Sequence, residues 1–184
     1  MDLKEVIQGC LEGRRGAWEM LVNSYSAKIF SMAYQFTGVQ AEAEDLTQEI
    51  FLKVFSSLGK FDREKNFTAW LLTLAKNHLI DEYRKTKWEK KNRDDFDDCL
   101  DRGLDRAKDG PEDDAVLNDT RRLIWDSLNL LPADVRMAIV LKELQGQTYE
   151  EAAQVLNLPV GTVKSRINRG KLALAKILQK QREA

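Results

Sequence analysis

The segment from Leu131 to Lys180 constrains this chain more than any other, because its pattern predicts short helices around a tight turn. Pro132 suits the first turn of a helix, where its missing N–H is not needed, and Gly146 suits a helix stop. The run 148–151 is a capping box, with a hydroxyl residue followed three positions later by glutamate, and it predicts a helix through Leu156.

A further helix is predicted beyond Pro159, because a residue that precedes proline is pushed out of the helical conformation. This helix begins near Val160, and its apolar residues recur at steps of three and four on one buried face: Val163, Ile167, Gly170, Leu174 and Ile177. Gly170 is expected to let another helix approach closely. Polar residues occupy the opposite face and its flanks: Lys164, Ser165, Arg166, Asn168 and Arg169.

Those polar residues are of the kinds that read DNA. Arginine binds guanine bidentately, asparagine binds adenine, and lysine and serine commonly hold phosphates. Residues 158–184 carry seven Lys or Arg against one Glu. A compact helix-turn-helix with a cationic outer face therefore predicts nucleic-acid binding, and the cap, the turn and the cations together weigh against a merely solvated basic helix.

The net charge of −1 hides a strong pattern along the chain. Residues 1–59 sum to −3, residues 60–93 to +5, residues 94–118 to −7 and residues 119–184 to +4. Two basic regions separated by an acidic strip are typical of a nucleic-acid binder with two sites and an anionic connector.

The acidic strip also predicts a domain boundary. Apolar periodicity is lost over residues 87–118, where Gly103, Gly110 and Pro111 interrupt the chain, and such a composition buries too little surface to offset the entropy of ordering. We therefore expect an all-α protein of two small helical domains, residues 1–86 and 119–184, joined by a flexible acidic linker at 87–118. A solvated spacer without any function is the simplest interpretation of that linker.

Four helices are predicted in the N-terminal part, at about residues 3–10, 15–36, 41–58 and 67–87, with a helix stop at Gly38. The third turns its apolar residues inward and presents a polar stripe on another side, and Leu52 lies within that stripe. A single apolar residue on a polar face is ordinary, and a protein-docking face would look the same.

The fourth helix has an apolar inward face and an outward face that carries Thr73, Lys76, Asn77 and Arg84. Trp70 lies on the border between the two faces. Basic groups beside aromatic rings suit single-stranded DNA, whose backbone the cations follow and whose bases stack on the rings. Spacing alone favours the alternative, that Trp70 belongs to the core.

Other classes of protein receive little support. The longest apolar runs are too short to cross a bilayer and the first ten residues lack a signal-peptide core, so a cytoplasmic protein is expected. Cys10, Cys99 and the single histidine, His78, are too scattered to favour a zinc site, and His78 is expected at the core or its boundary. Incidental thiols are a simpler interpretation of the cysteines than redox sensors. Without a phosphate-binding glycine loop or a nucleophile–base constellation, neither an enzyme nor a cofactor is expected.

These segments together resemble the ECF (extracytoplasmic function) sigma factors, two-domain initiation factors of bacterial RNA polymerase. The resemblance covers about residues 9–86 and 119–180, and it is carried by AEDLTQEIFLKVFSSLGKF, FTAWLLTLAKNHLIDEYRK, LPADVRMAIVLKEL and TYEEAAQVLNLPVGTVKSRINRGK. The pairing of PVGTVKSR with AEDLTQE is far more specific than a helix-turn-helix alone.

The resemblance implies partners and roles that spacing does not. It implies docking on the polymerase core, at the beta-prime clamp and the beta flap, with the clamp bound by Asp45, Gln48, Glu49 and Leu52. It implies that the loop 61–68 captures a flipped base of the promoter −10 element, and that this element is held by Phe61, Lys65, Asn66, Phe67, Thr68, Trp70, Lys76, Asn77, Arg84 and Lys85. It implies that the −35 element is read by Thr162, Lys164, Ser165, Arg166, Asn168, Arg169 and Lys171.

The family also implies an anti-sigma partner, and it implies that the acidic linker runs towards the polymerase's RNA path. Two other classes stay open on the residues alone. An ordinary DNA-binding regulator, dimerising through its N-terminal domain, would bind a palindromic duplex tightly by itself. An adaptor that docks on polymerase without reading DNA would tolerate the loss of Arg166 and Arg169.

Overall fold

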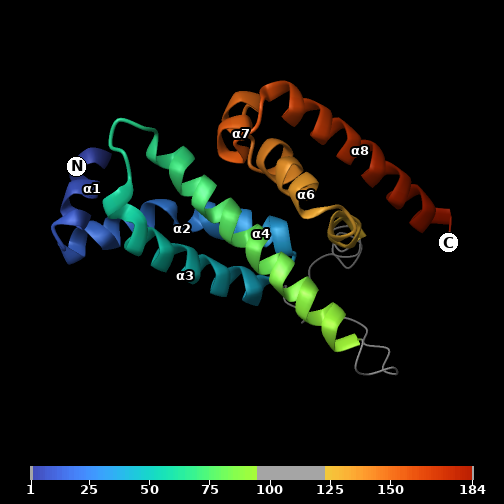
Figure 1. Ribbon diagram of the computed structural model, residues 1–184, viewed down its shortest axis with the longest axis horizontal. Helices are drawn as coiled ribbons and strands as arrows, with labels where there is room; N and C mark the ends of the chain where they lie inside the picture. Colours follow the sequence, from blue (N-terminus) through green and yellow to red (C-terminus); the bar gives the residue numbers. More distant parts are fainter. Residues whose placement is uncertain (1, 95–122, 184) are drawn as a thin grey trace, which may run out of the picture.

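The computed structural model describes residues 2–94 and 123–183, with side chains placed for 2–89 and 123–180. Every regular element in these ranges is helical, which confirms the all-α prediction (Figure 1). The N-terminal half contains α1 (Leu3–Leu11), α2 (Arg15–Thr37), α3 (Gln40–Ser57), a 3-10 turn (Leu58–Lys60) and α4 (Phe67–Asp94). The C-terminal half contains a helical segment at residues 123–129, α6 (Ala133–Ile139), a π-helical turn (Val140–Leu144), α7 (Tyr149–Leu156) and α8 (Val160–Glu183).

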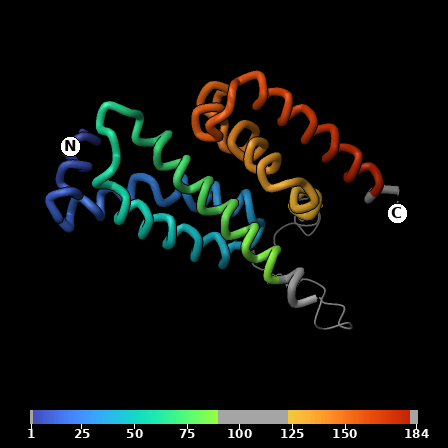
Figure 2. The backbone as a smooth tube through the Cα atoms, viewed as in Figure 1, coloured from blue at the N-terminus to red at the C-terminus, as the bar shows by residue number. Residues whose placement is uncertain are grey.

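The N-terminal half is a bundle in which α2, α3 and α4 pack around one apolar core (Figure 2). The side chains of Ile29 from α2, Ile50 from α3 and Ala75 from α4 have no solvent exposure. Gly38 closes α2 in the left-handed conformation, with φ 76°, as its predicted role as a helix stop requires. None of the helices in the described residues combines the length and apolarity needed to cross a membrane.

The C-terminal half shows the predicted caps. The Thr148 hydroxyl accepts a hydrogen bond from the Glu151 amide at 3.1 Å, and the Glu151 carboxylate accepts one from the Thr148 amide at 2.8 Å. Asn157 ends α7 in the left-handed conformation, with φ 54°, so the chain turns sharply into α8. Val163 and Ile167 on the inner face of α8 are fully buried, which completes the predicted helix-turn-helix.

Gly170 has the packing role that the sequence predicts. A Cβ atom at this position would lie 2.6 Å from Val135 Cγ1 and 2.9 Å from Ile139 Cδ1, both on α6. The absence of a side chain at residue 170 therefore sets how closely α6 and α8 approach.

The fourth helix continues further than predicted. It was expected to end near Lys87, yet α4 extends to Asp94, so the first eight residues of the predicted linker are helical. Lysine, arginine and glutamate are good helix formers without apolar partners, so the loss of apolar periodicity marks where α4 leaves the core and not where the helix ends. The rest of the predicted linker, residues 95–118, and Cys99 within it lie outside the described residues.

The two halves pack against each other, which the sequence did not predict. A continuous apolar cluster extends through both, and α4 lies against α6 and α7. Arg136 of α6 is only 1% exposed, and its guanidinium donates a hydrogen bond to the carbonyl of Phe36 at the end of α2 at 3.1 Å. The same guanidinium lies over the rings of Phe36 and Tyr83, at 4.9 and 4.6 Å from their centroids.

The close approach at Gly170 leads to a prediction about stability. Gly170→Leu is expected to lower the free energy of unfolding by about 1–3 kcal/mol, because the added side chain must push α6 and α8 apart. Gly161→Leu is the control in the same helix, because a Cβ there meets open space. It should be neutral or slightly stabilising, since leucine favours helix over glycine. Urea unfolding followed by circular dichroism measures both, and equal effects would contradict the packing role.

Candidate nucleic-acid and protein interfaces

The outer face of α8 is open to solvent over most of the predicted reading residues. Lys164, Ser165, Asn168 and Arg169 are exposed, and Thr162 and Arg166 are half-buried. The Ser165 hydroxyl donates to the Thr162 carbonyl at 3.0 Å, and Arg169 Nε donates to the Ser165 carbonyl at 3.4 Å. The structure therefore brings six of the seven predicted residues together on one accessible helical face.

Two of the cations of α8 have partners that the sequence did not reveal. Lys164 Nζ lies 5.3 Å from the centroid of the Tyr149 ring, and Lys142 Nζ approaches the same ring at 5.1 Å. Lys171 Nζ forms an ion pair with Glu143 at 2.7 Å, and the hydrogen bond to this carboxylate raises the pKa of Lys171. The carboxylate of Glu143 therefore neutralises part of the positive charge that Lys171 offers to DNA.

The outer face of α3 presents two large apolar side chains. Leu52 is 70% exposed and Phe55, three residues further along the helix, is 64% exposed, while Asp45, Gln48 and Glu49 are exposed on the same helix. Residues three apart are neighbours on a helix surface, so the spacing from Leu52 could have identified Phe55, which the sequence analysis missed. An apolar pair beside acidic groups is suited to docking a protein partner.

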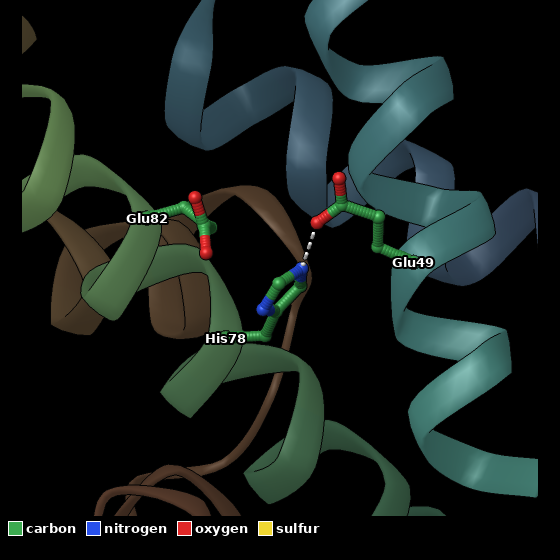
Figure 3. A group of neighbouring side chains, drawn as sticks. All are labelled: Glu49, His78 and Glu82. Atoms are coloured by element: carbon green, nitrogen blue, oxygen red, sulfur yellow. Dashed lines mark hydrogen bonds and ion pairs between the residues drawn. The ribbon is translucent and has the colours of Figure 1, made fainter.

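Glu49 also has a partner inside the bundle (Figure 3). His78 is buried, as expected from the sequence, and its Nε2 lies 2.7 Å from Glu49 Oε2. The side chain of His78 is 2% exposed and that of Glu49 is 53% exposed, so the carboxylate satisfies the Nε2 atom of a buried imidazole while it still reaches solvent. This contact joins α3 to α4.

The same place is the sole group of three possible metal ligands among residues 2–94 and 123–183. Ligand atoms of Glu49, His78 and Glu82 lie within 4.8 Å of one another. Glu49 already hydrogen-bonds to Nε2 of the imidazole, and Glu82 forms an ion pair with Lys85 at 3.7 Å, whereas the buried Nδ1 of His78 has no hydrogen-bond partner. Cys10 is buried in α1, and this burial raises the pKa of its thiol, which disfavours a reactive thiolate.

The predicted base-capture loop, residues 61–68, is built on an aromatic cluster. The rings of Phe61, Phe67 and Trp70 lie 5.1 to 5.6 Å apart between centroids. Phe61 and Phe67 are buried, so both rings belong to the core and hold the loop in place, and their contact with DNA stays a prediction. Lys65 and Asn66 are exposed at its tip, and Asn66 Oδ1 accepts a hydrogen bond from the Ala69 amide at 3.0 Å, which caps α4.

The outward face of α4 contacts the C-terminal half at some positions and stays exposed at others. The Thr73 hydroxyl lies 3.4 Å from the Val155 carbonyl of α7, and Arg84 forms an ion pair with Asp134 of α6 at 3.2 Å. Lys76 is half-buried, and this desolvation lowers its pKa although Asp134 acts in the opposite direction. Asn77 and Lys85 stay exposed, and Thr68 and Trp70 are half-buried.

Comparison with known proteins identifies the family. The models for Sigma-70 region 2 and Sigma-70 region 4 match residues 21–89 and 121–174. The ECF RNA polymerase sigma factor SigW of Bacillus subtilis is 34% identical over 188 residues, covering 97% of this chain and 98% of the relative. The chain belongs to the ECF sigma factors. The ECF sigma-E factor of Escherichia coli K12 is 30% identical, over 92% of this chain and 90% of the relative.

Two solved structures share the fold of this sigma factor. RpoE of Bartonella quintana, solved in complex with the anti-sigma factor NepR, is 28% identical, with a TM-score of 0.63 over 88% of this chain and 96% of that chain. CnrH, solved in complex with the cytosolic domain of CnrY, is 24% identical, with a TM-score of 0.70 over 97% of this chain and 99% of that chain. Both likenesses extend over the N-terminal and C-terminal halves.

The Glu49–His78 contact predicts that Glu49 stabilises the fold in addition to any role at the surface. Glu49→Ala is expected to lower the free energy of unfolding by about 1–2 kcal/mol, because the buried imidazole loses its hydrogen-bond partner. The double variant with His78→Leu should recover most of this loss, since both polar partners are then gone. Gln48→Ala, at an exposed neighbouring position, is the control, and an equal loss in this control would contradict the proposed contribution.

Proposed function

We propose that this sigma factor binds the core of bacterial RNA polymerase and directs it to promoters by reading the −35 and −10 elements and helping to melt the duplex. The observation that carries the proposal is the match of both family regions to one chain whose α8 presents an open cationic reading face. Bond formation belongs to the polymerase in this assignment, and the sigma factor acts without catalytic groups of its own.

The −35 element is assigned to the outer face of α8. Arg169 and Arg166 are placed to contact base edges in the major groove, and Asn168 has the amide that pairs with adenine. Lys164 and Ser165 are assigned to phosphates. The Tyr149 ring supports this assignment because it holds the ammonium of Lys164 at the start of the reading helix.

The −10 element is assigned to the loop 61–68 and to α4. Lys65 and Asn66 at the loop tip are exposed and can contact a flipped base, while the buried rings of Phe61 and Phe67 keep the loop in position. The melted strand is assigned to the α4 side of this loop, at Thr68, Trp70, Lys76, Asn77, Arg84 and Lys85.

Core docking is assigned to α3, at Asp45, Gln48, Glu49 and Leu52, to which we add Phe55 because of its exposure. We further assign residues 1–86 and 119–184 to the two functional domains, the beta flap as a second polymerase contact, and the cytoplasm as the place of action. An anti-sigma factor is proposed as the regulator, supported by the RpoE–NepR structure, in which a similar sigma factor is bound by one.

Run-off transcription tests this function. Purified bacterial core polymerase, this protein and a fragmented library of the source genome should give discrete transcripts that require the protein, and their start sites define the −35 and −10 elements. Core binding without any transcript would favour an adaptor. Retention of duplex DNA without core binding would favour an ordinary DNA-binding regulator.

The reading role of α8 predicts the effect of one substitution. Arg169→Ala should weaken binding to the −35 element by about 1–3 kcal/mol if its guanidinium contacts a base edge. Promoter-dependent transcription should fall by roughly 5- to 150-fold as a result. Lys176→Ala, an exposed cation two turns further along α8, is the control for lost charge. Equal transcription from the two variants would contradict the assignment of Arg169 to a base contact.

The docking role of α3 predicts a loss of polymerase affinity. The double variant Leu52→Ser with Phe55→Ser should bind core at least about ten-fold more weakly, because two exposed apolar side chains that a partner would bury are removed. Leu130→Ser removes an equally exposed leucine from the C-terminal half and serves as the control. Unchanged core affinity of the folded double variant, measured by fluorescence anisotropy, would refute the docking assignment.

A further inference from the structure

A histidine and two carboxylates gather where α3 meets α4 (Figure 3). Glu49 comes from α3, and His78 and Glu82 lie one turn apart on α4. Each of the three offers a ligand atom that lies within 4.8 Å of the other two. Residues four apart share one face of a helix, so α4 supplies a pair of ligands and α3 supplies the third from the opposite side.

The imidazole of His78 is only partly used by the fold. Its Nε2 lies 2.7 Å from Glu49 Oε2, whereas its buried Nδ1 has no hydrogen-bond partner among the described residues. Buried polar atoms without a partner are uncommon in native proteins, and an ion that belongs at the site is one reason for them. A neutral imidazole carries its proton on one nitrogen and a lone pair on the other. Because nothing donates to Nδ1, the ring proton can move there without breaking a hydrogen bond, and the lone pair of Nε2 is then free for a cation beside Glu49.

The two carboxylates connect this buried ring to solvent. The side chain of His78 is 2% exposed, while those of Glu49 and Glu82 are 53% and 34% exposed. Four-coordinate zinc holds its ligand atoms roughly 3.3 Å apart, so the two glutamates need only small shifts to close on an ion. Lys85 is a weak competitor for Glu82, because its ammonium lies 3.7 Å from the carboxylate and its side chain is 63% exposed.

The mixed set of donors selects the kind of ion. Mg²⁺ and Ca²⁺ prefer sites made of oxygen atoms, whereas an imidazole nitrogen favours transition-metal ions such as Zn²⁺. Three protein ligands fill all but one position of a tetrahedral Zn²⁺, and a water takes the last. The charges of the two carboxylates together neutralise a divalent cation, so an ion beside the buried ring leaves no uncompensated charge.

We propose that Glu49, His78 and Glu82 form a binding site for Zn²⁺, and that the bound ion withdraws Glu49 from the docking face of α3. The site rests on the geometry of the three side chains, whereas its effect on docking rests on the proposed function, which assigns Glu49 to core polymerase. A carboxylate held by a cation offers little charge to a partner, so the zinc-bound protein binds core more weakly than the zinc-free protein.

Competition with a chromophoric zinc indicator tests the site without polymerase. The full chain carries Cys99→Ser, so that this thiol does not bind the ion. A single Zn²⁺ should bind per chain, and excess Mg²⁺ should not displace it. Glu82→Gln should weaken Zn²⁺ binding at least about ten-fold, because even the outer partners of metal ligands are commonly worth that much. Glu49→Gln should have the same effect while its amide oxygen still accepts a hydrogen bond from His78.

Glu89→Gln is the matched control, because it removes an exposed acid from the same helix two turns beyond Glu82. It should leave the affinity for Zn²⁺ unchanged. Thermal unfolding gives a second readout, since an ion that binds only the folded chain raises Tm. Zn²⁺ should raise the Tm of the parent chain and of Glu89→Gln, and should leave that of Glu82→Gln unchanged.

Core affinity tests the effect on docking. Fluorescence anisotropy of the labelled protein with purified core polymerase is compared with and without added Zn²⁺. Zn²⁺ should weaken core binding of the parent chain roughly two- to five-fold, the range expected for one exposed charge contact. Core binding by Glu82→Gln should not respond to Zn²⁺, because this variant keeps every residue assigned to docking and lacks one ligand of the ion.

The outcomes that would overturn the proposal are distinguishable. If no Zn²⁺ binds, if Mg²⁺ displaces it, or if Glu82→Gln and Glu89→Gln bind it equally well, the three side chains are not a zinc site. If Zn²⁺ binds through them but core affinity does not change, the ion does not withdraw Glu49. If the protein binds no core even without Zn²⁺, the proposed function fails together with the effect on docking, while the zinc site stands on its own measurement.

Discussion

The arrangement of the two halves depends on one buried cation. Arg136 has 1% of its surface exposed, and a charge can occupy the interior only when hydrogen bonds replace its water. Carbonyl oxygens of Phe36, Asn129 and Leu131 supply these bonds, and one of the three comes from the other half. The Phe36 carbonyl lies at the C-terminal end of α2, where the helix dipole favours a cation. Arg136 therefore stabilises both the C-terminal half and its contact with the end of α2.

Around this buried anchor, the side-chain hydrogen bonds and the ion pair between the halves are partly exposed, and an apolar cluster continues beneath them. The side chains of Arg84 and Asp134 are 60% and 48% exposed, and exposed ion pairs contribute little to stability. Interfaces between domains of one chain commonly have this polar character and open readily. The buried anchor and the apolar cluster, and not the exposed ion pair, therefore supply most of the stabilisation between the halves.

The sequence predicted the features that arise from neighbouring residues. The Thr148–Glu151 cap, the left-handed stop at Gly38, the close approach at Gly170 and the buried face of α8 all follow from local spacing, and the structure confirms each of them. It did not predict the contacts made by residues far apart in the chain. The ring of Tyr149 contacts the ammonium groups of Lys142 and Lys164 only after folding brings these two residues to it. The family resemblance assigns Phe61 and Phe67 to DNA, and it does not reveal their burial, because burial depends on packing between helices.

On the proposed assignment, α8 and α4 contact two different forms of DNA. Duplex DNA exists before melting, and α8, which reads duplex, is open in the docked state. A single strand exists only after melting, and α4, which would hold it, keeps Asn77, Arg84 and Lys85 exposed beside its contacts with α6 and α7. A free protein with an open α4 would bind any single strand through its cations and aromatics, because such binding is largely independent of sequence. The duplex contact of α8 therefore has to supply sequence selection that the contact of α4 with the strand backbone does not.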